Sequence, residues 1–202
     1  MKDKYKQAIE ANIYADQFSS NHMNIQDWFM LAWARNIPEL TEFPQNNFPI
    51  LNLGAGHRNI GKSVSLDLEH GWDAEKDDIP YADESISGIW AHGFFEHISP
   101  ERIPFLLLEC QRVLCLNGVL NIVVPHALSD MYVEDFTHKS LWHEDTLDNL
   151  FNNPYYYNGI EHKWQFRIHT QFIMGVVWRN LGLFIQLVKE EINTNTKQRI
   201  KL

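Results

Sequence analysis

Short apolar runs that end in glycine, acidic residues or proline recur through the middle of the chain. Residues 49–53 form the first run, and residues 63–68 and 86–91 form the next two. Residues 119–124 form a fourth, which Pro125 stops. Runs of this length between turn signals are typical of strands that are buried on both faces of a sheet. We therefore predict four buried strands in residues 48–126.

A helix is expected between the third and fourth strands. Apolar residues return there at steps of three or four, and Pro100-Glu101 supplies a helix start; the apolar positions are Ile103, Leu106, Leu107, Cys110, Val113 and Leu114. Asn117-Gly118 then turns the chain. Alternation of strands with crossovers predicts a doubly wound α/β domain with a mostly parallel sheet. Such sheets bind ligands beyond the carboxyl ends of their strands.

The ends of the chain have a different pattern. Apolar spacing before Pro44 predicts a helical cap over residues 1–45. Two apolar runs, 172–178 and 181–189, predict an antiparallel hairpin within residues 171–191. We expect one domain over residues 1–202, in which residues 48–126 form the core of the sheet and residues 127–170 form an insert before the hairpin.

Composition narrows the class of protein. The 202 residues are 45% hydrophobic and carry a net charge of −9, with no visible basic stripe, so neither nucleic-acid binding nor a membrane span is expected. Residues 1–10 are too polar for a secretory signal. The two cysteines, Cys110 and Cys115, have no metal-ligand spacing, and we interpret them as reduced thiols of a cytoplasmic protein.

The turn Gly54-Ala55-Gly56 after the first strand is a candidate ligand-binding loop. Glycines let the backbone approach a ligand closely. A dinucleotide fingerprint would need a further glycine where the chain has Asn59. Lys62-Ser63 stands at the wrong distance from Gly54 for a phosphate-binding loop. The loop alone therefore favours no single cofactor.

Two acidic residues follow the glycine turn at places that suit a nucleoside. Asp67 ends the second strand, where a carboxylate can accept hydrogen bonds from both ribose hydroxyls. Asp73 can accept a hydrogen bond from an adenine amino group, while Trp72 or Ala74 covers the ring.

The order and spacing of these motifs resemble the class I S-adenosylmethionine-dependent methyltransferases, and within them the type 11 group. The resemblance covers residues 48–126, and residues 135–139 show a weaker similarity. It rests on the segments Ile50-Leu51-Asn52-Leu53-Gly54-Ala55-Gly56-His57-Arg58, Ser65-Leu66-Asp67, Trp72-Asp73-Ala74, Ile79-Pro80-Tyr81-Ala82-Asp83-Glu84-Ser85-Ile86, Phe95-Glu96-His97-Ile98 and Glu109-Cys110-Gln111-Arg112-Val113-Leu114.

The resemblance implies a Rossmann-like sheet of seven strands and S-adenosylmethionine as the cofactor, with S-adenosylhomocysteine as product. It also implies that residues 48–126 form the cofactor-binding core and that residues 127–170 form an insert on the acceptor side. Carried over residue by residue, it places ten positions at the cofactor: Asn52, Gly54, Ala55, Gly56, Arg58, Asp67, Leu68, Asp73, Ala74 and His92. The family often has an acid where this chain has Asn52 and a third glycine where it has Arg58. These departures bear on the methionine end of the site, where Arg58 is suited to hold the cofactor carboxylate.

Methyl transfer from a sulfonium needs alignment and exclusion of water more than a nucleophile. A general base is useful for an oxygen or nitrogen acceptor, and His92 is the first choice, followed by His126 and His138. A structural role is the alternative for each histidine. Glu96-His97 with His92 lacks the spacing of zinc proteases, so we expect a structural pair at a helix start and no metal.

Aromatic side chains gather in the outer segments: Tyr14, Trp28, Phe29, Trp33, Trp142 and Tyr155-Tyr156-Tyr157. They line a pocket for a small planar or apolar acceptor, or they pack the cover onto the sheet; the second interpretation is favoured. The preferred function is methyl transfer to a small molecule. A non-catalytic binding or partner protein and a nicotinamide-dependent oxidoreductase are the alternatives. The oligomeric state stays open.

Overall fold

The structure is a computed structural model that describes residues 43–44, 46–56, 62–153, 164–174 and 181–191. The described part is built around a six-stranded mixed sheet of order β2-β1-β3-β4-β6-β5. The strands are β1 (Ile50–Leu53), β2 (Val64–Leu66), β3 (Ile86–His92), β4 (Leu114–Pro125), β5 (Phe166–Met174) and β6 (Gly182–Lys189). Strands β1 to β4 pair in parallel, and β5 and β6 pair antiparallel.

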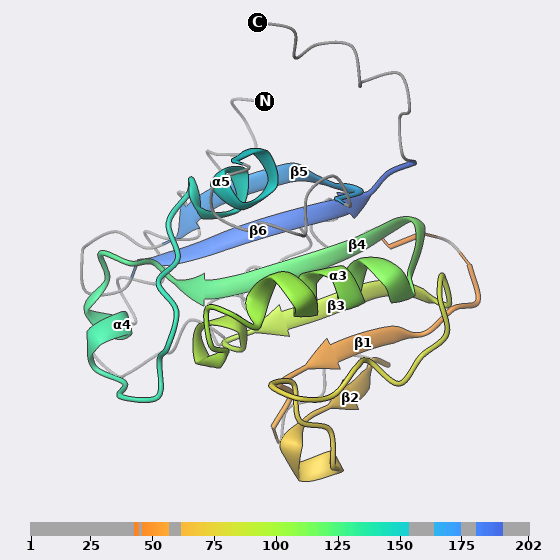
Figure 1. The fold of residues 1–202 in the computed structure, drawn as a ribbon, viewed down its shortest axis with the longest axis horizontal. Helices are drawn as coiled ribbons and strands as arrows, with labels where there is room; N and C mark the ends of the chain where they lie inside the picture. The colour runs from red at the N-terminus through yellow and green to blue at the C-terminus, as the bar shows by residue number, and fades with distance from the viewer. Residues whose placement is uncertain (1–42, 45, 57–61, 154–163, 175–180, 192–202) are drawn as a thin grey trace, which may run out of the picture.

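The described helices are α3 (Ile103–Val113), α4 (Asp130–Val133) and α5 (Thr146–Asn152), with single 3₁₀ turns η2 (Leu68–His70) and η3 (Phe95–His97). Helices α3 and α5 lie in front of the sheet in Figure 1, and α4 lies beside the ends of β4 and β6. No described helix has the length and apolar character needed to cross a bilayer.

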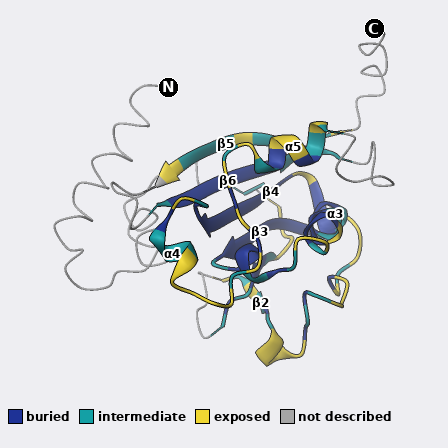
Figure 2. Ribbon diagram, turned by 60° about the vertical axis from the view of Figure 1, so that its left-hand side comes forward, coloured by how far each residue is buried: buried dark blue, intermediate teal, exposed yellow. Residues whose placement is uncertain are grey.

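The main core lies between α3, α5 and the sheet face that they cover. Leu106, Leu107 and Cys110 of α3 are fully buried against alternate residues of the strands, such as Leu51 and Ile89. Figure 2 shows the central strands buried along their length and exposed residues along β5, at the edge of the sheet. The period of the α3 sequence therefore corresponds to a face that is buried in the tertiary structure.

The four strands and the helix predicted in residues 48–126 are present, with shifted limits. The fourth predicted strand, residues 119–124, begins earlier in β4 because Leu114 already pairs with Ile86. The expected turn at Asn117-Gly118 lies inside β4, where the register between β3 and β4 shifts and Asn117 has a φ of 61°. The second predicted strand, residues 63–68, ends early because Asp67 caps η2.

The hairpin is confirmed as antiparallel, but the limits predicted for its first strand, 172–178, were late. Strand β5 starts at Phe166, inside the range expected for the acceptor-side insert. Its first residues alternate between buried and exposed positions, as in Phe166 and Arg167, which fits a strand at the edge of the sheet. In the sequence, this alternation is a weaker strand signal than the apolar run that follows it, so the start of the strand was predicted too late.

The described residues supply six of the seven strands expected, and all but residues 43 and 44 of the expected cap, 1–45, lie outside them. The aromatic residues of the outer segments, for which packing was favoured over lining a pocket, also lie outside them, except Trp142. That side chain is buried and packs on Phe95 with ring centroids 5.7 Å apart, so it belongs to the core. Both Cys110 and Cys115 are buried free thiols, as expected.

Candidate active site

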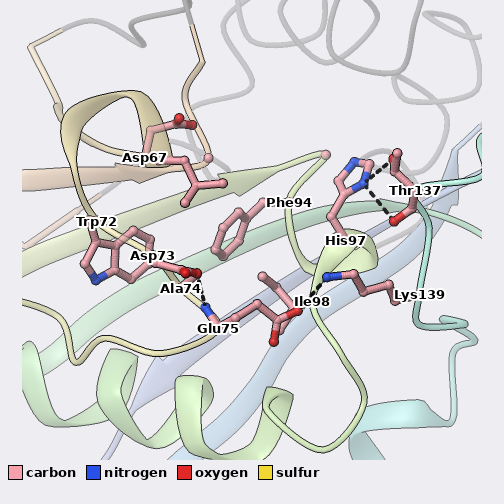
Figure 3. Close-up of a pocket in the computed structure, with 13 residues that line it drawn as sticks. Asp67, Trp72, Asp73, Ala74, Glu75, Phe94, His97, Ile98, Thr137 and Lys139 are labelled. Carbon is pink, nitrogen blue, oxygen red and sulfur yellow. Dashed lines mark hydrogen bonds and ion pairs between the residues drawn. The ribbon is translucent and has the colours of Figure 1, made fainter.

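A pocket of about 470 Å³ lies where β1, β2 and β3 end. This volume is within the usual range for ligand sites, roughly 300–1,000 Å³. Figure 3 shows side chains from the end of β2, the segment after β3 and residues 137–139 facing one another across it. The lining residues are Gly54, Asp67, Leu68, Trp72, Asp73, Ala74, Glu75, Gly93, Phe94, His97, Ile98, Thr137 and Lys139.

Gly54 lies at the floor of the pocket, directly after β1. Its N–H donates to the carbonyl of Leu66 at 2.9 Å, which holds the ends of β1 and β2 together. Its φ is +64°, and an added Cβ would stand 2.4 Å from Cδ2 of Phe94. Glycine is required here for both conformation and space.

Asp67 joins the glycine loop to the next turn. Its Oδ2 accepts a hydrogen bond from the backbone N–H of Gly56 at 2.9 Å, and its Oδ1 accepts one from Glu69 at 3.0 Å. A carboxylate has about four acceptor positions. These two bonds therefore fix the orientation of Asp67 and leave acceptor capacity for ligand hydroxyls at the edge of the pocket.

Two stacked aromatic rings form one wall. The rings of Trp72 and Phe94 have centroids 6.1 Å apart and planes 25° apart, and both side chains are buried. The indole N–H of Trp72 donates to the carbonyl of Asp78 at 3.0 Å, so the ring is held in place from behind. Both rings line the pocket, so this wall is apolar and aromatic.

Asp73 has its carboxylate engaged within its own loop. Its Oδ1 accepts from the N–H of Glu75 at 3.0 Å, and its Oδ2 accepts from Nζ of Lys76 at 2.6 Å. The hydrogen bond from Lys76, helped by that from Glu75, lowers the pKa of Asp73 below its ordinary value. The side chain is therefore an ionised acceptor beside the aromatic wall.

Glu75 ties this loop to two other parts of the chain. Its carboxylate accepts hydrogen bonds from the backbone and the hydroxyl of Ser99, and from Nζ of Lys139 at 2.7 Å. Burial pushes its pKa up, but the bonds from Lys139 and Ser99 outweigh burial and hold the pKa below its ordinary value. The opposite wall of the pocket is thus held by an ion pair between residues far apart in sequence.

A second group of polar side chains stands at the far end of the pocket from Trp72. Glu96 and His97 of η3 meet His138, and one potential ligand atom of each lies within 4.8 Å of the others. Burial raises the pKa of Glu96 to about 8, while backbone hydrogen bonds oppose the shift. Burial and the nearby His138 lower the pKa of His97. The expectation for Glu96-His97 considered His92 as their partner, whereas the fold supplies His138 instead.

The histidines proposed as bases lie in different surroundings. His92 is buried next to the Trp90 ring, and burial lowers its pKa to about 3. It does not belong to the lining of this pocket. His126 is buried after β4, where its Nδ1 accepts from the N–H of Leu128 and its Nε2 contacts Oε2 of Glu144 at 2.9 Å.

The structure thus brings together half of the predicted cofactor positions. Gly54, Asp67, Leu68, Asp73 and Ala74 line the pocket. Asn52, Ala55, Gly56 and His92 do not line it, although Gly56 is bonded to Asp67, and Arg58 lies outside the described residues. The roles of these residues remain predictions.

Several lining residues were missed by sequence reasoning. Phe94 follows β3 directly, so its place after a strand end was a usable signal. The only sequence signal for Thr137 and Lys139 was the weak similarity to the family at residues 135–139. Glu75 could not be found from its neighbours, because its role depends on Lys139, 64 residues away.

Comparisons with known proteins agree with this architecture at the level of fold. No model of a known protein family matches the sequence, and no curated protein matches it. Solved structures do match. A S-adenosylmethionine-dependent methyltransferase from Archaeoglobus fulgidus is 18% identical, with a TM-score of 0.54 over 79% of this chain and 94% of its own.

Two further matches are similar in extent. A S-adenosylmethionine-dependent methyltransferase from Methanosarcina mazei is 14% identical, with a TM-score of 0.51 over 77% of this chain and 98% of its own. A chain from a Haloferax volcanii complex that contains the Trm112 methyltransferase activator is 14% identical, with a TM-score of 0.53 over 75% of this chain and 86% of its own.

Proposed function

We propose that this chain, whose fold is that of the class I S-adenosylmethionine-dependent methyltransferases, binds S-adenosylmethionine and transfers its methyl group to a small-molecule acceptor. The observation that carries the proposal is the pocket at the ends of β1 to β3, in which the Asp67 carboxylate, the Gly54 turn and the Trp72–Phe94 wall converge. Ligand sites of open α/β sheets lie at this edge.

The residues present fit the cofactor part by part. Asp67 is oriented by two backbone N–H groups and keeps acceptor capacity for two ribose hydroxyls. The Trp72–Phe94 wall suits the adenine ring, and Asp73 stands beside it as an ionised acceptor for an amino group. Gly54 lines the pocket with bare backbone and lets the Phe94 ring pack against it, where an added Cβ would stand 2.4 Å from Cδ2 of Phe94.

When bound, the cofactor supplies a methyl group that its sulfonium already activates. The protein then has to align the acceptor and exclude water. The Glu75–Lys139 ion pair holds the wall that encloses this space, and His97 and Thr137 present polar atoms at its far end. The pocket volume of about 470 Å³ is in the range of small-molecule sites, which supports a small acceptor.

Titration calorimetry with S-adenosylhomocysteine, with NAD as the control ligand, tests the cofactor. We expect binding of the first at micromolar Kd or tighter and no binding of the second. Asp67→Ala is expected to weaken binding by about 1–3 kcal/mol, since ribose hydroxyls lose their acceptor. This corresponds to roughly a 5- to 150-fold rise in Kd.

Asp148→Ala is the matched control, because Asp148 is an exposed aspartate of α5 that does not line the pocket. Thermal unfolding of each variant checks that it folds. Unchanged affinity in Asp67→Ala would show that the ribose is placed wrongly. Cofactor binding with no turnover on any acceptor in a screen would favour a non-catalytic binding protein.

A further inference from the structure

Glu96, His97 and His138 form a compact set of ligand-bearing side chains beside the pocket, which we name the Glu-His-His cluster. The rings of His97 and His138 have centroids 4.8 Å apart, and one ligand atom of each of the three residues lies within 4.8 Å of the others. The backbone N–H groups of Lys139 and Ser140 donate to the carbonyl of Glu96 at 2.7 and 3.2 Å. These bonds hold the segment of His138 against η3.

The hydrogen bonds around His97 determine which ring nitrogen carries its proton. The Thr137 hydroxyl donates its single hydrogen to Oδ1 of Asp135 at 2.6 Å. The same hydroxyl lies 2.9 Å from Nδ1 of His97 and, having used its hydrogen, must accept there. Nδ1 of neutral His97 therefore carries the hydrogen, and Nε2 has the lone pair.

His138 reaches the same tautomer by a simpler route. Its Nδ1 lies 2.9 Å from the carbonyl oxygen of Tyr132, which can only accept. Nδ1 must therefore donate, and in the neutral ring Nε2 keeps the lone pair, with Oδ2 of Asp135 3.8 Å away. A histidine that ligates a metal usually donates its other ring N–H to a carbonyl, a carboxylate or water. In His138 this acceptor is a carbonyl, and in His97 it is a hydroxyl that is itself bonded to a carboxylate.

Glu96 completes the set with a buried carboxylate. Its side chain is 2% exposed, and its Oε2 has no hydrogen-bond partner. A buried polar atom without a partner is costly, at roughly 1–3 kcal/mol, and in a native structure it calls for an explanation. A cation bound at this oxygen would supply one.

A second group of the same composition behaves differently. In His126, Nδ1 accepts from the N–H of Leu128 at 3.1 Å, so in the neutral ring Nε2 carries the hydrogen and donates it to Glu144 at 2.9 Å. Both ring nitrogens are thus engaged, and the hydrogen bond to the carboxylate accounts for the contact. This group, His126, His143 and Glu144, serves as an internal control for the Glu-His-His cluster.

We propose that Glu96, His97 and His138 bind a divalent transition-metal ion, with zinc as the representative ion, through one carboxylate oxygen and two imidazole nitrogens. Two histidines and one carboxylate form a known donor set for zinc that leaves coordination positions open. His97 lines the pocket, so a metal held by this residue would lie beside the space assigned to the acceptor. An acceptor with an oxygen donor, such as a hydroxyl or carboxylate, suits an open coordination position; that role rests on the proposed function, whereas metal binding does not.

The test uses the full chain without a polyhistidine tag, stripped of metal with a chelator and titrated with Zn²⁺ by calorimetry and with Co²⁺ by visible absorption. We expect one equivalent to bind at micromolar Kd or tighter. Glu96→Gln and His138→Gln are expected to raise the Kd at least 10- to 100-fold. His126→Gln, the matched control from the second group, is expected to bind as the wild type does.

Far-UV circular dichroism and thermal unfolding of the metal-free variants establish that each one folds. Failure of the folded wild type to bind one equivalent, or equal binding by wild type and Glu96→Gln, would overturn the proposal. A larger loss in His126→Gln than in His138→Gln would also overturn it. Because no cofactor is present in this titration, its outcome is independent of S-adenosylhomocysteine binding.

Discussion

At the scale of single residues, Gly54 shows how a turn and a pocket constrain the same position. Its backbone has a φ of +64°, and the Phe94 ring occupies the space where a side chain would stand. Gly71 provides a comparison, because its φ of +82° is equally unfavourable for other residues, but an added Cβ there would meet nothing within 4 Å.

We expect Gly54→Ala to lower the free energy of unfolding by about 2–4 kcal/mol, through left-handed strain and overpacking against Phe94. Gly71→Ala is expected to cost only the strain, about 1–2 kcal/mol. Urea denaturation of both variants measures the difference. Equal losses would mean that the Phe94 ring moves away at no cost.

Burial makes His92 a source of pH-dependent stability. Its pKa is lowered to about 3 in the folded protein, against an ordinary value of 6.5. The unfolded chain therefore binds more protons between these pH values, and the contribution to stability is complete above pH 6.5 and lost as the pH falls toward 3. With this pKa, the imidazole is also a weak base at neutral pH.

We expect the free energy of unfolding of the wild type to fall between pH 7 and pH 5 by up to about 2 kcal/mol more than that of His92→Gln. Denaturant unfolding at the two pH values measures this difference. His169→Gln, which alters an exposed histidine of β5, is the control for loss of a histidine as such. Parallel pH profiles of wild type and His92→Gln would contradict the role of burial.

At the scale of elements, the C-terminal end of α3 is attached to the loop before β3 by the side chains of Arg112 and Glu109. The Arg112 guanidinium donates to the carbonyls of Ile79 and Tyr81 at 2.9 and 2.8 Å, and to both carboxylate oxygens of Glu109. Glu109 in turn accepts from the N–H of Ile79 at 3.0 Å. These bonds hold α3, which covers the sheet, to the loop at residues 79–81, which follows the pocket wall.

Arg112→Met is expected to lower the free energy of unfolding by about 1–3 kcal/mol, because partly buried carbonyls lose charged donors. Arg167→Met is the matched control, since Arg167 pairs with Glu190 at the exposed edge of the sheet. Such a surface pair contributes about 0–1 kcal/mol. Chemical denaturation compares the two, and a larger loss at Arg167 would contradict this account of α3.

At the scale of the whole molecule, the pocket joins segments that are distant in sequence. Glu75, after β2, meets Ser99, after η3, and Lys139, after α4. Lys139 is also bonded through its backbone N–H to the carbonyl of Glu96. The enclosure of the pocket therefore depends on residues 137–139 docking across the sheet edge.

We expect Glu75→Gln and Lys139→Met each to weaken S-adenosylhomocysteine binding by about 1 kcal/mol, or roughly fivefold in Kd, because both break the same ion pair. The double variant is expected to bind no more weakly than either single variant, since residues in contact are not additive. Calorimetry on the four proteins measures this cycle. Fully additive losses would show that the two residues act independently.

The sequence alone determined the local features of this protein, namely its central strands, its main helix and the turns after the strands. Strand runs that end in turn signals, and the three- and four-residue steps over 103–114, predicted β1 to β4 and α3 because buried strands and amphipathic helices have their own periods. Gly54 and Asp67 followed from their places after strands, since the carboxyl ends of neighbouring parallel strands meet at one sheet edge.

Only the tertiary structure decided which distant residues meet. The ion pair of Glu75 with Lys139 and the set of Glu96, His97 and His138 depend on how residues 135–140 dock on η3, and no spacing in one sequence encodes that contact. The burial of His92 beside Trp90 is likewise a property of packing. The local periodicity of a sequence shows which face of a helix or strand is buried. The packing of distant segments determines which residues that face contacts, and the chemistry of this pocket depends on both.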